Sequence, residues 1–503
     1  MTVAPTATLP RLATVAAAAV AAFTLVPLAY VLGFGLASAE EAPALLLRER
    51  VGELLVNTTA LVVAGCIACA VIGVGAAWLV ERTTLPGRPV WTAFMAAPLA
   101  VPAFVNSYGW VSLTSAVEGY WGAVLITTMS YFPLVYLPAA AVLRGMDPAF
   151  EDMSRALGNG PWRTFGRVVL PQLRPALLGG VLLVGLHLLA EYGALEALRF
   201  STFTTAVYTV FQSTFDGPAA TMLSGVLVLG CLLLLFGESR LAGRSRVARI
   251  GSGAARAAVR HPLGGFGPVA WLAMAALVTL ALAVPLGSLV HWLVTGNSTA
   301  FPLAMLATTT STAVGLGLAG AALTCVLALP VAWVCVRRPG RFERLLERST
   351  YIAGSLPGIV VALAFVVLAI GTPLYQSTLL LVGAYAVMFM PRVMVSLRAA
   401  LLQVPPELDD VGRSLGVRPI GVACRVTVPL VARGLGAGAA LVFLAVVTEL
   451  TATLLLAPNG TATLATEFWS HTSALEYGAA APYALLMIVV SAPAAFLLTR
   501  EAS

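Results

Sequence analysis

Two stretches of the sequence, 258 positions apart, decide how the chain is organised. The first reads DPAFEDMSRALGNGPWRTFGRVVLPQLRPA (residues 147–176), and the second reads PPELDDVGRSLGVRPIGVACRVTVPLVARG (residues 405–434). Both contain an RxLG motif, and in both a proline follows thirteen residues after the motif glycine. These positions are Gly158 and Pro171 in the first stretch and Gly416 and Pro429 in the second. Because two copies keep the same spacing, the sequence predicts an internal repeat.

Each stretch carries the signals of a short helix followed by a turn. A proline (Pro148 or Pro406) and acidic residues open it, as the N-terminus of a helix favours. The motif glycine can end that helix in a left-handed conformation that other residues avoid. A second helical stretch is predicted to end at Pro171 or Pro429, where a membrane span begins. Since this is the best-matched segment of the repeat, we expect the short helix to dock a partner rather than merely connect two spans.

Apolar runs surround these stretches and make up most of the 503 residues. Hydrophobic residues are 59% of the chain, charged residues only 10%, and the mean hydropathy is +0.93. A soluble domain carries about 25% charged residues, so the composition excludes a water-soluble enzyme. About 20 apolar residues span a bilayer. The sequence therefore predicts twelve spans, at roughly 12–38, 54–80, 90–113, 122–143, 176–198, 219–237, 267–294, 304–336, 349–370, 377–397, 435–456 and 482–499.

The same offset of 258 relates further residues of the two halves. The aligned pairs include Pro27 and Pro285, Pro133 and Pro391, Arg155 and Arg413, and Glu191 and Glu449. Six spans per half give both halves the same orientation, which predicts a parallel repeat about an axis along the membrane normal. The predicted parts are a first repeat over 1–237 with its matched loop at 144–175, a cytoplasmic linker over 238–262, and a second repeat over 263–503 with its loop at 398–434.

All 29 basic residues are arginine, and the sequence contains no lysine. A GxxxxGK[ST] phosphate-binding loop needs that lysine, so another chain must hydrolyse ATP if this protein uses it in that way. With the N-terminus in the cytoplasm, 25 arginines fall in the inner segments and three in the outer segments, which predicts that both termini are cytoplasmic. Membrane orientation therefore accounts for the net charge of +7, and we expect no nucleic-acid partner.

The two matched loops resemble the EAA loop of permease subunits of ATP-binding-cassette (ABC) importers. That pattern is EAA, three residues, Gly, and a hydrophobic segment with Pro about thirteen residues further on. The chain keeps the Gly-to-Pro spacing, but the EAA positions are Asp152-Met153-Ser154 and Asp410-Val411-Gly412. The acidic charge is thus kept and the two alanines are not. Further stretches, at 57–88, 97–110, 190–209 and 448–466, make nearly the whole chain similar to fused, two-half permeases of the ferric-iron type.

This resemblance implies an all-α membrane protein with the fold of a type I ABC importer permease, in a bacterial inner membrane. It implies two copies of a cytoplasmic ABC ATPase, one on each loop, and an extracytoplasmic substrate-binding protein. ATP and Mg would belong to the ATPase, and this chain would carry no cofactor, metal or catalytic residue of its own. The loop residues implied in coupling are Glu151, Asp152, Arg155, Gly158, Pro171, Asp409, Asp410, Arg413, Gly416 and Pro429.

Two acidic residues, Glu191 and Glu449, lie at repeat-equivalent positions in apolar runs. A carboxylate in hydrocarbon is costly unless it faces a cavity or a partner. Two interpretations are open: a pair of carboxylates near the outer mouth of a central pathway, or caps that bond nearby backbone where a helix ends. Tyr192 and Thr451 beside them fit either interpretation.

Two prolines inside apolar runs, Pro102 and Pro357, are further candidates for the pathway. A proline in a span can break its helix, and broken helices tend to line substrate routes. A simple kink is the alternative for each of them.

The chemistry of these candidate residues ranks ferric iron first as the substrate, ahead of thiamine and a phosphonate. Carboxylates and hydroxyls suit a polar, weakly binding route for ferric iron, because a tight cage would prevent release. Thiamine would favour aromatic stacking, and a phosphonate would favour arginines or helix N-termini along the route. A secondary transporter driven by an ion gradient would share the twelve-span layout but would not need the two matched loops. A membrane enzyme would need a nucleophile, base or metal constellation, which we do not find in the sequence.

Overall fold

The computed structural model describes the backbone of residues 11–38, 40, 42–242, 260–296, 301–338, 340–405, 407–415, 417 and 419–501. Throughout these residues the chain is helical, and its single β-type contact is an isolated bridge between Thr83 and His261. This confirms the prediction of an all-α protein with many apolar helices.

The chain forms two compact units that differ from the two sequence repeats. Unit 1 comprises Met1–Pro43, Val207–Val228 and Ser298–Ser503, and unit 2 comprises Ala44–Ala206 and Leu229–Asn297. Each unit therefore contains the first span of the other repeat. In unit 1, helix α1 (Arg11–Ala37) packs against helices of the second repeat, and the rings of Phe23 and Phe365 stack with centroids 5.8 Å apart.

Unit 2 shows the reciprocal arrangement. Helix α15 (Val284–Thr295), from the second repeat, packs against α5 (Ala103–Val111) of the first. The hydroxyl oxygens of Ser112 and Ser288 are 2.8 Å apart, and a Cβ added to Gly109 would lie 2.5 Å from the Cα of Pro285. The first span of each repeat is thus held by the other repeat, whereas the repeat boundaries at 237 and 263 stay a prediction from sequence.

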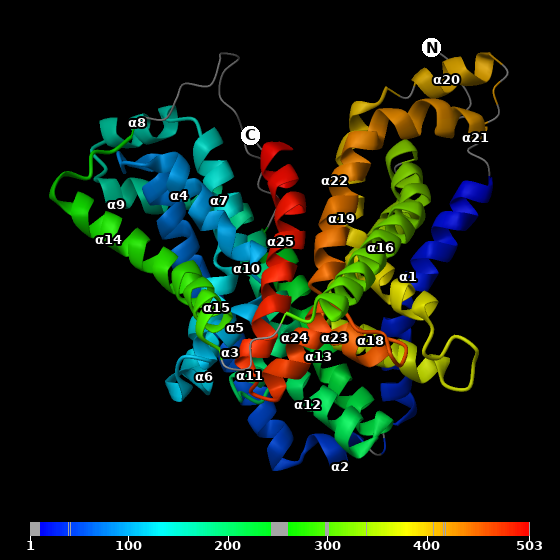
Figure 1. Cartoon of the computed structure of the whole chain (residues 1–503). Helices are drawn as coiled ribbons and strands as arrows, with labels where there is room; N and C mark the ends of the chain where they lie inside the picture. The colour runs from blue at the N-terminus through cyan, green and yellow to red at the C-terminus, as the bar shows by residue number, and fades with distance from the viewer. Residues whose placement is uncertain are drawn as a thin grey trace. The chain divides into compact units, whose positions relative to one another are not determined.

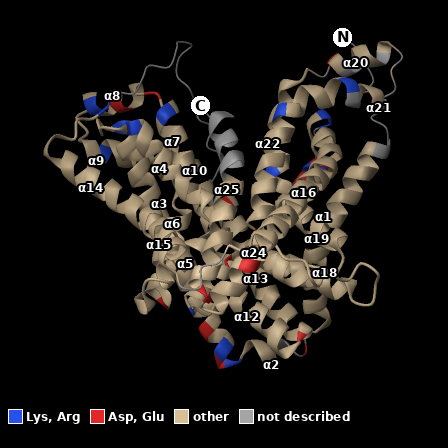
Figure 2. Ribbon diagram, viewed as in Figure 1, with Lys and Arg blue, Asp and Glu red and all other residues tan. Residues whose placement is uncertain are grey.

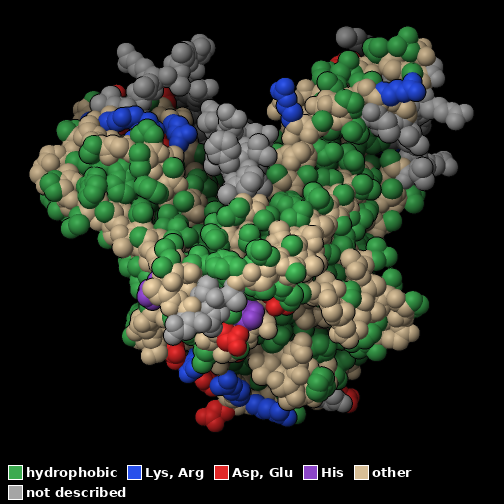
Figure 3. Space-filling model, viewed as in Figure 1, with side chains coloured by type: hydrophobic (Ala, Val, Ile, Leu, Met, Phe, Trp, Pro, Cys, Tyr) green, Lys and Arg blue, Asp and Glu red, His purple; other side chains and the backbone are tan. Residues whose placement is uncertain are grey.

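The other helices of unit 2 lead up to and away from the first matched loop (Figure 1). They are α3 (Glu49–Arg82), α4 (Arg88–Ala96), α6 (Tyr120–Tyr131), α7 (Pro133–Gly145), α8 (Ala149–Ala156), α9 (Pro161–Thr164), α10 (Leu170–Ala190), α11 (Gly193–Ala197) and α14 (Gly267–Val278). Short 3-10 or π segments lie at Ala97–Ala100, Ser115–Val117, Phe165–Val169, Gly264–Phe266 and Thr279–Ala283. The visible flank of α14 is covered with hydrophobic side chains, as a lipid-facing helix requires (Figure 3).

Unit 1 contains the corresponding helices of the second repeat. They are α16 (Leu303–Arg337), α17 (Arg341–Ala353), α18 (Gly358–Ala369), α19 (Thr378–Gln403), α20 (Glu407–Ser414), α21 (Pro419–Val422), α22 (Val428–Val447), α23 (Thr451–Leu456), α24 (Leu464–Ser473) and α25 (Tyr477–Glu501). Helix α2 (Ala42–Leu46) and the helices α12 (Phe203–Thr209) and α13 (Gly217–Ala242) lie at the boundaries between the units in the sequence.

The predicted spans correspond to helices of the described residues. Nine helical stretches are long and apolar enough to cross a membrane, two sharply bent helix pairs bring the number to eleven, and α25 adds a shorter apolar stretch over Tyr477–Ser491. The long run at 304–336 is a single helix, α16. The predicted runs 176–198 and 435–456 extend too far, because the spans end at Ala190 and Val447. Apolarity continues beyond both ends, but the backbone turns at an acidic residue and begins another helix.

The bundle core depends on helices that approach closely at glycines. A Cβ on Gly180 of α10 would lie 2.8 Å from the carbonyl oxygen of Leu134 and 2.9 Å from the Cα of Val135 on α7. Its repeat equivalent, Gly438 of α22, would meet the Cα of Val393 on α19 at 3.0 Å. Small residues at such contacts let backbones pack tightly where lipid provides no hydrophobic driving force.

We expect Gly180→Ala to lower the free energy of unfolding by about 1–3 kcal/mol, because the new methyl group overlaps backbone atoms that have no free space to move into. The adjacent Gly179→Ala is the matched control, since a Cβ there meets nothing within 4 Å. Thermal unfolding of the detergent-solubilised chain, followed by size-exclusion chromatography, measures the difference. Equal midpoints for the two variants would contradict the packing argument.

Candidate functional site

The first matched loop folds as a short helix that ends at a left-handed glycine. Gly158 has φ +80°, and its amide donates to the carbonyl of Arg155 at 2.9 Å. The amide of Asn159 donates to Ser154 O at 3.1 Å, which completes the end of α8. A Cβ at Gly158 would meet nothing within 4 Å, so the conformation rather than crowding requires glycine. The predicted turn is therefore confirmed at Gly158, whereas Gly416 lies outside the described residues.

Helix α8 has one face buried in unit 2 and one face exposed. Glu151 and Ser154 are buried, and the Ser154 hydroxyl lies 3.0 Å from that of Thr164 on α9. On the exposed side, Leu157 is 80% and Trp162 is 86% accessible, and Met153 is also exposed. Exposed large apolar side chains grouped at a polar end of a protein mark an interaction surface. This loop therefore presents an apolar contact surface on a fixed support.

Ion pairs attach α8 to the end of α3. Arg82 is only 1% exposed, and its guanidinium lies 3.1 Å from the carboxylate of Glu151. Arg155 lies 3.5 Å from the other oxygen of the same carboxylate. A second buried carboxylate, that of Glu81, pairs with Arg88 and, at 2.9 Å, with Arg144. Charged residues gather at this end of unit 2, around α8 (Figure 2). Because a buried charge is tolerated only when it is paired, the Arg82–Glu151 pair holds α8 against the end of α3.

The second matched loop repeats part of this arrangement in unit 1. Val411 of α20 and Leu415 just after it, the equivalents of Met153 and Leu157, are exposed. Gly412 is buried, and a Cβ there would approach Val422 at 2.7 Å. Arg337 at the end of α16 donates to the carbonyl of Val404 at 3.0 Å. The side chains of Asp409, Asp410 and Arg413 lie outside the described residues, so their predicted coupling roles stay predictions.

One prediction for both loops is wrong. The second helical stretch does not end at Pro171 or Pro429 but continues into the span, as Pro161–Ala190 in the first repeat and Arg425–Val447 in the second. A π-helical turn precedes each proline, at Phe165–Val169 and Ala423–Thr427. In the first turn the amide of Leu170 bonds to the carbonyl of Phe165, five residues back. This wider turn accommodates a proline that lacks an amide donor, so the helix does not have to break.

Glu191 and Glu449 both cap a short helix just after a span ends. The Glu191 carboxylate accepts a hydrogen bond from the amide of Ala194 at 3.0 Å, at the start of α11, and a second from the Tyr131 hydroxyl. The Glu449 carboxylate accepts from the amide of Ala452 at 2.9 Å, at the start of α23. The capping interpretation is thus observed for each residue. A carboxylate that accepts one such bond still has free acceptor positions on its two oxygens.

Both candidate prolines break their helices rather than kink them. Helices before and after Pro102 are bent by 92°, and those around Pro357 by 99°. In unit 1 the break lies beside the capping carboxylate, because a Cβ on Gly358 would approach the Glu449 oxygen at 3.2 Å. Thr451 is buried there, and Tyr192 is buried beside Glu191 in unit 2. Each unit thus brings a capping carboxylate next to a buried hydroxyl-bearing side chain.

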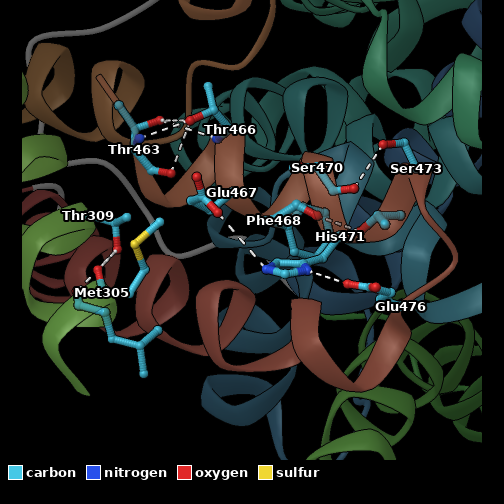
Figure 4. Close-up of polar contacts among 12 residues, drawn as sticks. Met305, Thr309, Thr463, Thr466, Glu467, Phe468, Ser470, His471, Ser473 and Glu476 are labelled. Atoms are coloured by element: carbon cyan, nitrogen blue, oxygen red, sulfur yellow. Dashed lines mark hydrogen bonds and ion pairs between the residues drawn. The ribbon is translucent and has the colours of Figure 1, made fainter. Parts of the chain in front are cut away.

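A cluster on α24 was not predicted from the sequence. His471 lies 2.7 Å from the Glu476 carboxylate and 4.0 Å from that of Glu467, and its ring stacks on Tyr483. Figure 4 shows His471 between the two carboxylates, on the helix that begins at the Thr463 cap. In the part of the chain that the structure describes, no group of three or more His, Cys, Asp and Glu is arranged to hold a metal ion. Only the i, i+4 spacing of Glu467 and His471 signals this cluster in the sequence.

Comparison with known families identifies the class of protein. Residues 70–246 and 326–500 each match the family described as "Binding-protein-dependent transport system inner membrane component". The chain belongs to this family. The two matches cover both repeats and include α8 and the described part of α20. The chain is therefore a multi-pass inner membrane protein and a permease subunit of a binding-protein-dependent ABC importer, a transport component rather than an enzyme.

Individual relatives agree with this assignment. The chain is 37% identical over 464 residues to "Fe(3+)-transport system permease protein FbpB 2" of Haemophilus influenzae, which covers 91% of this chain and 92% of that protein. It is 23% identical over 410 residues to "Ferric transport system permease protein FbpB" of Actinobacillus pleuropneumoniae, covering 78% and 60% of the two chains. A sulfate permease of Escherichia coli, CysT, is 32% identical over 195 residues, or 35% of this chain and 70% of CysT.

Proposed function

We propose that this permease moves ferric iron across the inner membrane. The observation that carries the proposal is the similarity to the Haemophilus influenzae ferric permease, which extends over both repeats, whereas the similarity to the sulfate permease extends over about one repeat. The capping carboxylates support it, because carboxylate oxygens lower the electrostatic barrier for a multivalent cation. An oxyanion is the second candidate, on the strength of the sulfate relative.

We further propose that α8 and α20 are the two coupling helices, each seated on one copy of a cytoplasmic ABC ATPase that binds ATP and Mg. The exposed apolar side chains support this in both loops: Met153 of α8, Leu157 just after it and Trp162 of α9 in the first, and Val411 of α20 and Leu415 just after it in the second. Burying such side chains in a partner groove is favourable by roughly 25 cal/mol per Å2. Both termini would then lie in the cytoplasm, and a substrate-binding protein would deliver iron to the opposite side.

The substrate route is proposed to pass the residues that follow the spans. Glu191, Tyr192 and the helix break at Pro102 are its candidates in the first repeat, and Glu449, Thr451 and the break at Pro357 are its candidates in the second. Such a route offers oxygen atoms without a closed set of ligands, so an ion could enter and leave.

Substrate identity is tested by uptake in cells that carry or lack this permease. We expect loss of radioactive ferric-iron uptake on deletion and recovery on complementation, with uptake of sulfate, thiamine and a phosphonate unchanged. All four uptake rates are measured in the same cells, so a general growth defect would lower all of them and would not imitate a specific loss of iron uptake. Unchanged iron uptake with lost uptake of sulfate or of an organic substrate would refute the assignment.

Coupling is tested by Gly158→Val. The left-handed conformation costs a residue with a Cβ about 1–2 kcal/mol, and a β-branched one more, so α8 should end incorrectly. We expect normal amounts of permease in the membrane but less co-purified ATPase and slower transport. Gly160→Val is the matched control, because Gly160 has φ −70° and open space around it. Full transport and normal ATPase recovery in Gly158→Val would show that this loop does not dock the ATPase.

The acidic pair is tested by variants that separate charge from capping. Glu191→Gln and Glu449→Gln keep an oxygen that can accept the helix-capping hydrogen bond but remove the charge, whereas the Ala variants remove both. We expect the double Gln variant to assemble and bind ATPase normally while transporting iron several-fold more slowly. If the double Gln variant transports at the normal rate and only the Ala variants fail, the carboxylates are structural caps alone.

A further inference from the structure

The downstream end of the linker, at His261, is hydrogen-bonded to the C-terminal end of α3, the helix that is ion-paired to α8. The amide of His261 donates to the carbonyl of Arg82 at 2.8 Å, and the amide of Thr84 donates to the carbonyl of His261 at 3.1 Å. The His261 ring stacks on Trp78 of α3, with the ring planes 16° apart and the centroids separated by 6.0 Å. All of these residues belong to unit 2. The linker therefore ends on the same turn of α3 that supplies Arg82 to the buried pair with Glu151.

The side chain of His261 contacts two residues of α8. Its Nε2 atom lies 2.9 Å from the Arg155 guanidinium and 3.8 Å from the Glu151 carboxylate, and Arg155 in turn lies 3.5 Å from Glu151. A guanidinium has only donors, so in a hydrogen bond between these two side chains Nε2 is the acceptor. His261, Arg155, Glu151 and Arg82 thus form one continuous chain of polar contacts beneath α8.

We propose that His261 is a positioning residue for ATP-driven transport: through Arg155 it fixes the orientation of the first coupling helix, so that residues 260–262 support that docking site. This inference rests on the proposed coupling role of α8. The physical reason is that Arg155 is on the last turn of α8, where a second partner besides Glu151 restricts how the helix can rotate. The property of His261 that the proposal requires is a hydrogen-bond acceptor at the position of Nε2, facing Arg155.

The experiment compares His261→Ala, His261→Gln and His261→Arg in the full-length permease in nanodiscs. Gln supplies an acceptor oxygen near the position of Nε2, Ala supplies nothing, and Arg places a donor against a donor. Arg260→Ala is the matched control, because Arg260 is the preceding residue of the linker and is exposed. Two quantities are measured: hydrogen exchange of the amides of residues 149–158 without ATPase, and the apparent affinity for the purified ATPase subunit.

We expect Ala and Arg to speed exchange in α8 and to weaken ATPase binding by about fivefold, as loss of a hydrogen bond to a charged group allows. Gln should remain close to the wild type in both measurements, and so should Arg260→Ala. Normal exchange and affinity in His261→Ala, or a Gln variant as defective as Ala, would overturn the inference. If the wild-type chain binds no ATPase, the proposed coupling role fails instead, and exchange in α8 still decides whether His261 holds that helix.

Discussion

Inside a bilayer no water is available to backbone amides and carbonyls, so every one of them must find a partner within the protein. That constraint explains why the described residues are mostly helical and why the structure compensates where some of the helices end or change. Where the spans end at Ala190 and Val447, a glutamate carboxylate accepts a hydrogen bond from a backbone amide at the start of the next short helix. Where Pro171 lacks an amide, a π-turn shifts the hydrogen bonding of the turn before it.

The same constraint shows why some features could be predicted from the sequence and others could not. Hydropathy alone located the spans, because a membrane helix must be apolar over its length. Proline chemistry indicated the breaks at Pro102 and Pro357, and the glycine signal located the end of α8 at Gly158. These are local properties, in which the residue that matters and the structure it causes are neighbours in the chain.

The features that escaped prediction depend on partners distant in sequence. Hydropathy did not locate the end of the span at Glu191, because mostly apolar residues follow it, and the sequence left open whether this carboxylate caps a helix. Nothing in the pattern of the linker shows that His261 contacts Trp78 and Arg155. For the same reason, the candidate coupling residues were predicted from a family resemblance and not from their contacts. The pairing of Glu151 with the buried Arg82 is seen only in the structure.

The reciprocal exchange of first spans has a consequence for how the protein is made. Helix α1 is synthesised early, but Phe365, which stacks on its Phe23, is added 342 residues later. At 5–20 residues per second, α1 waits roughly 20–70 s in the membrane before that partner exists. During this interval its unpaired face is open to lipid and to other proteins. Unit 1 therefore assembles only after most of the chain has been translated, and neither repeat is a self-sufficient unit of folding.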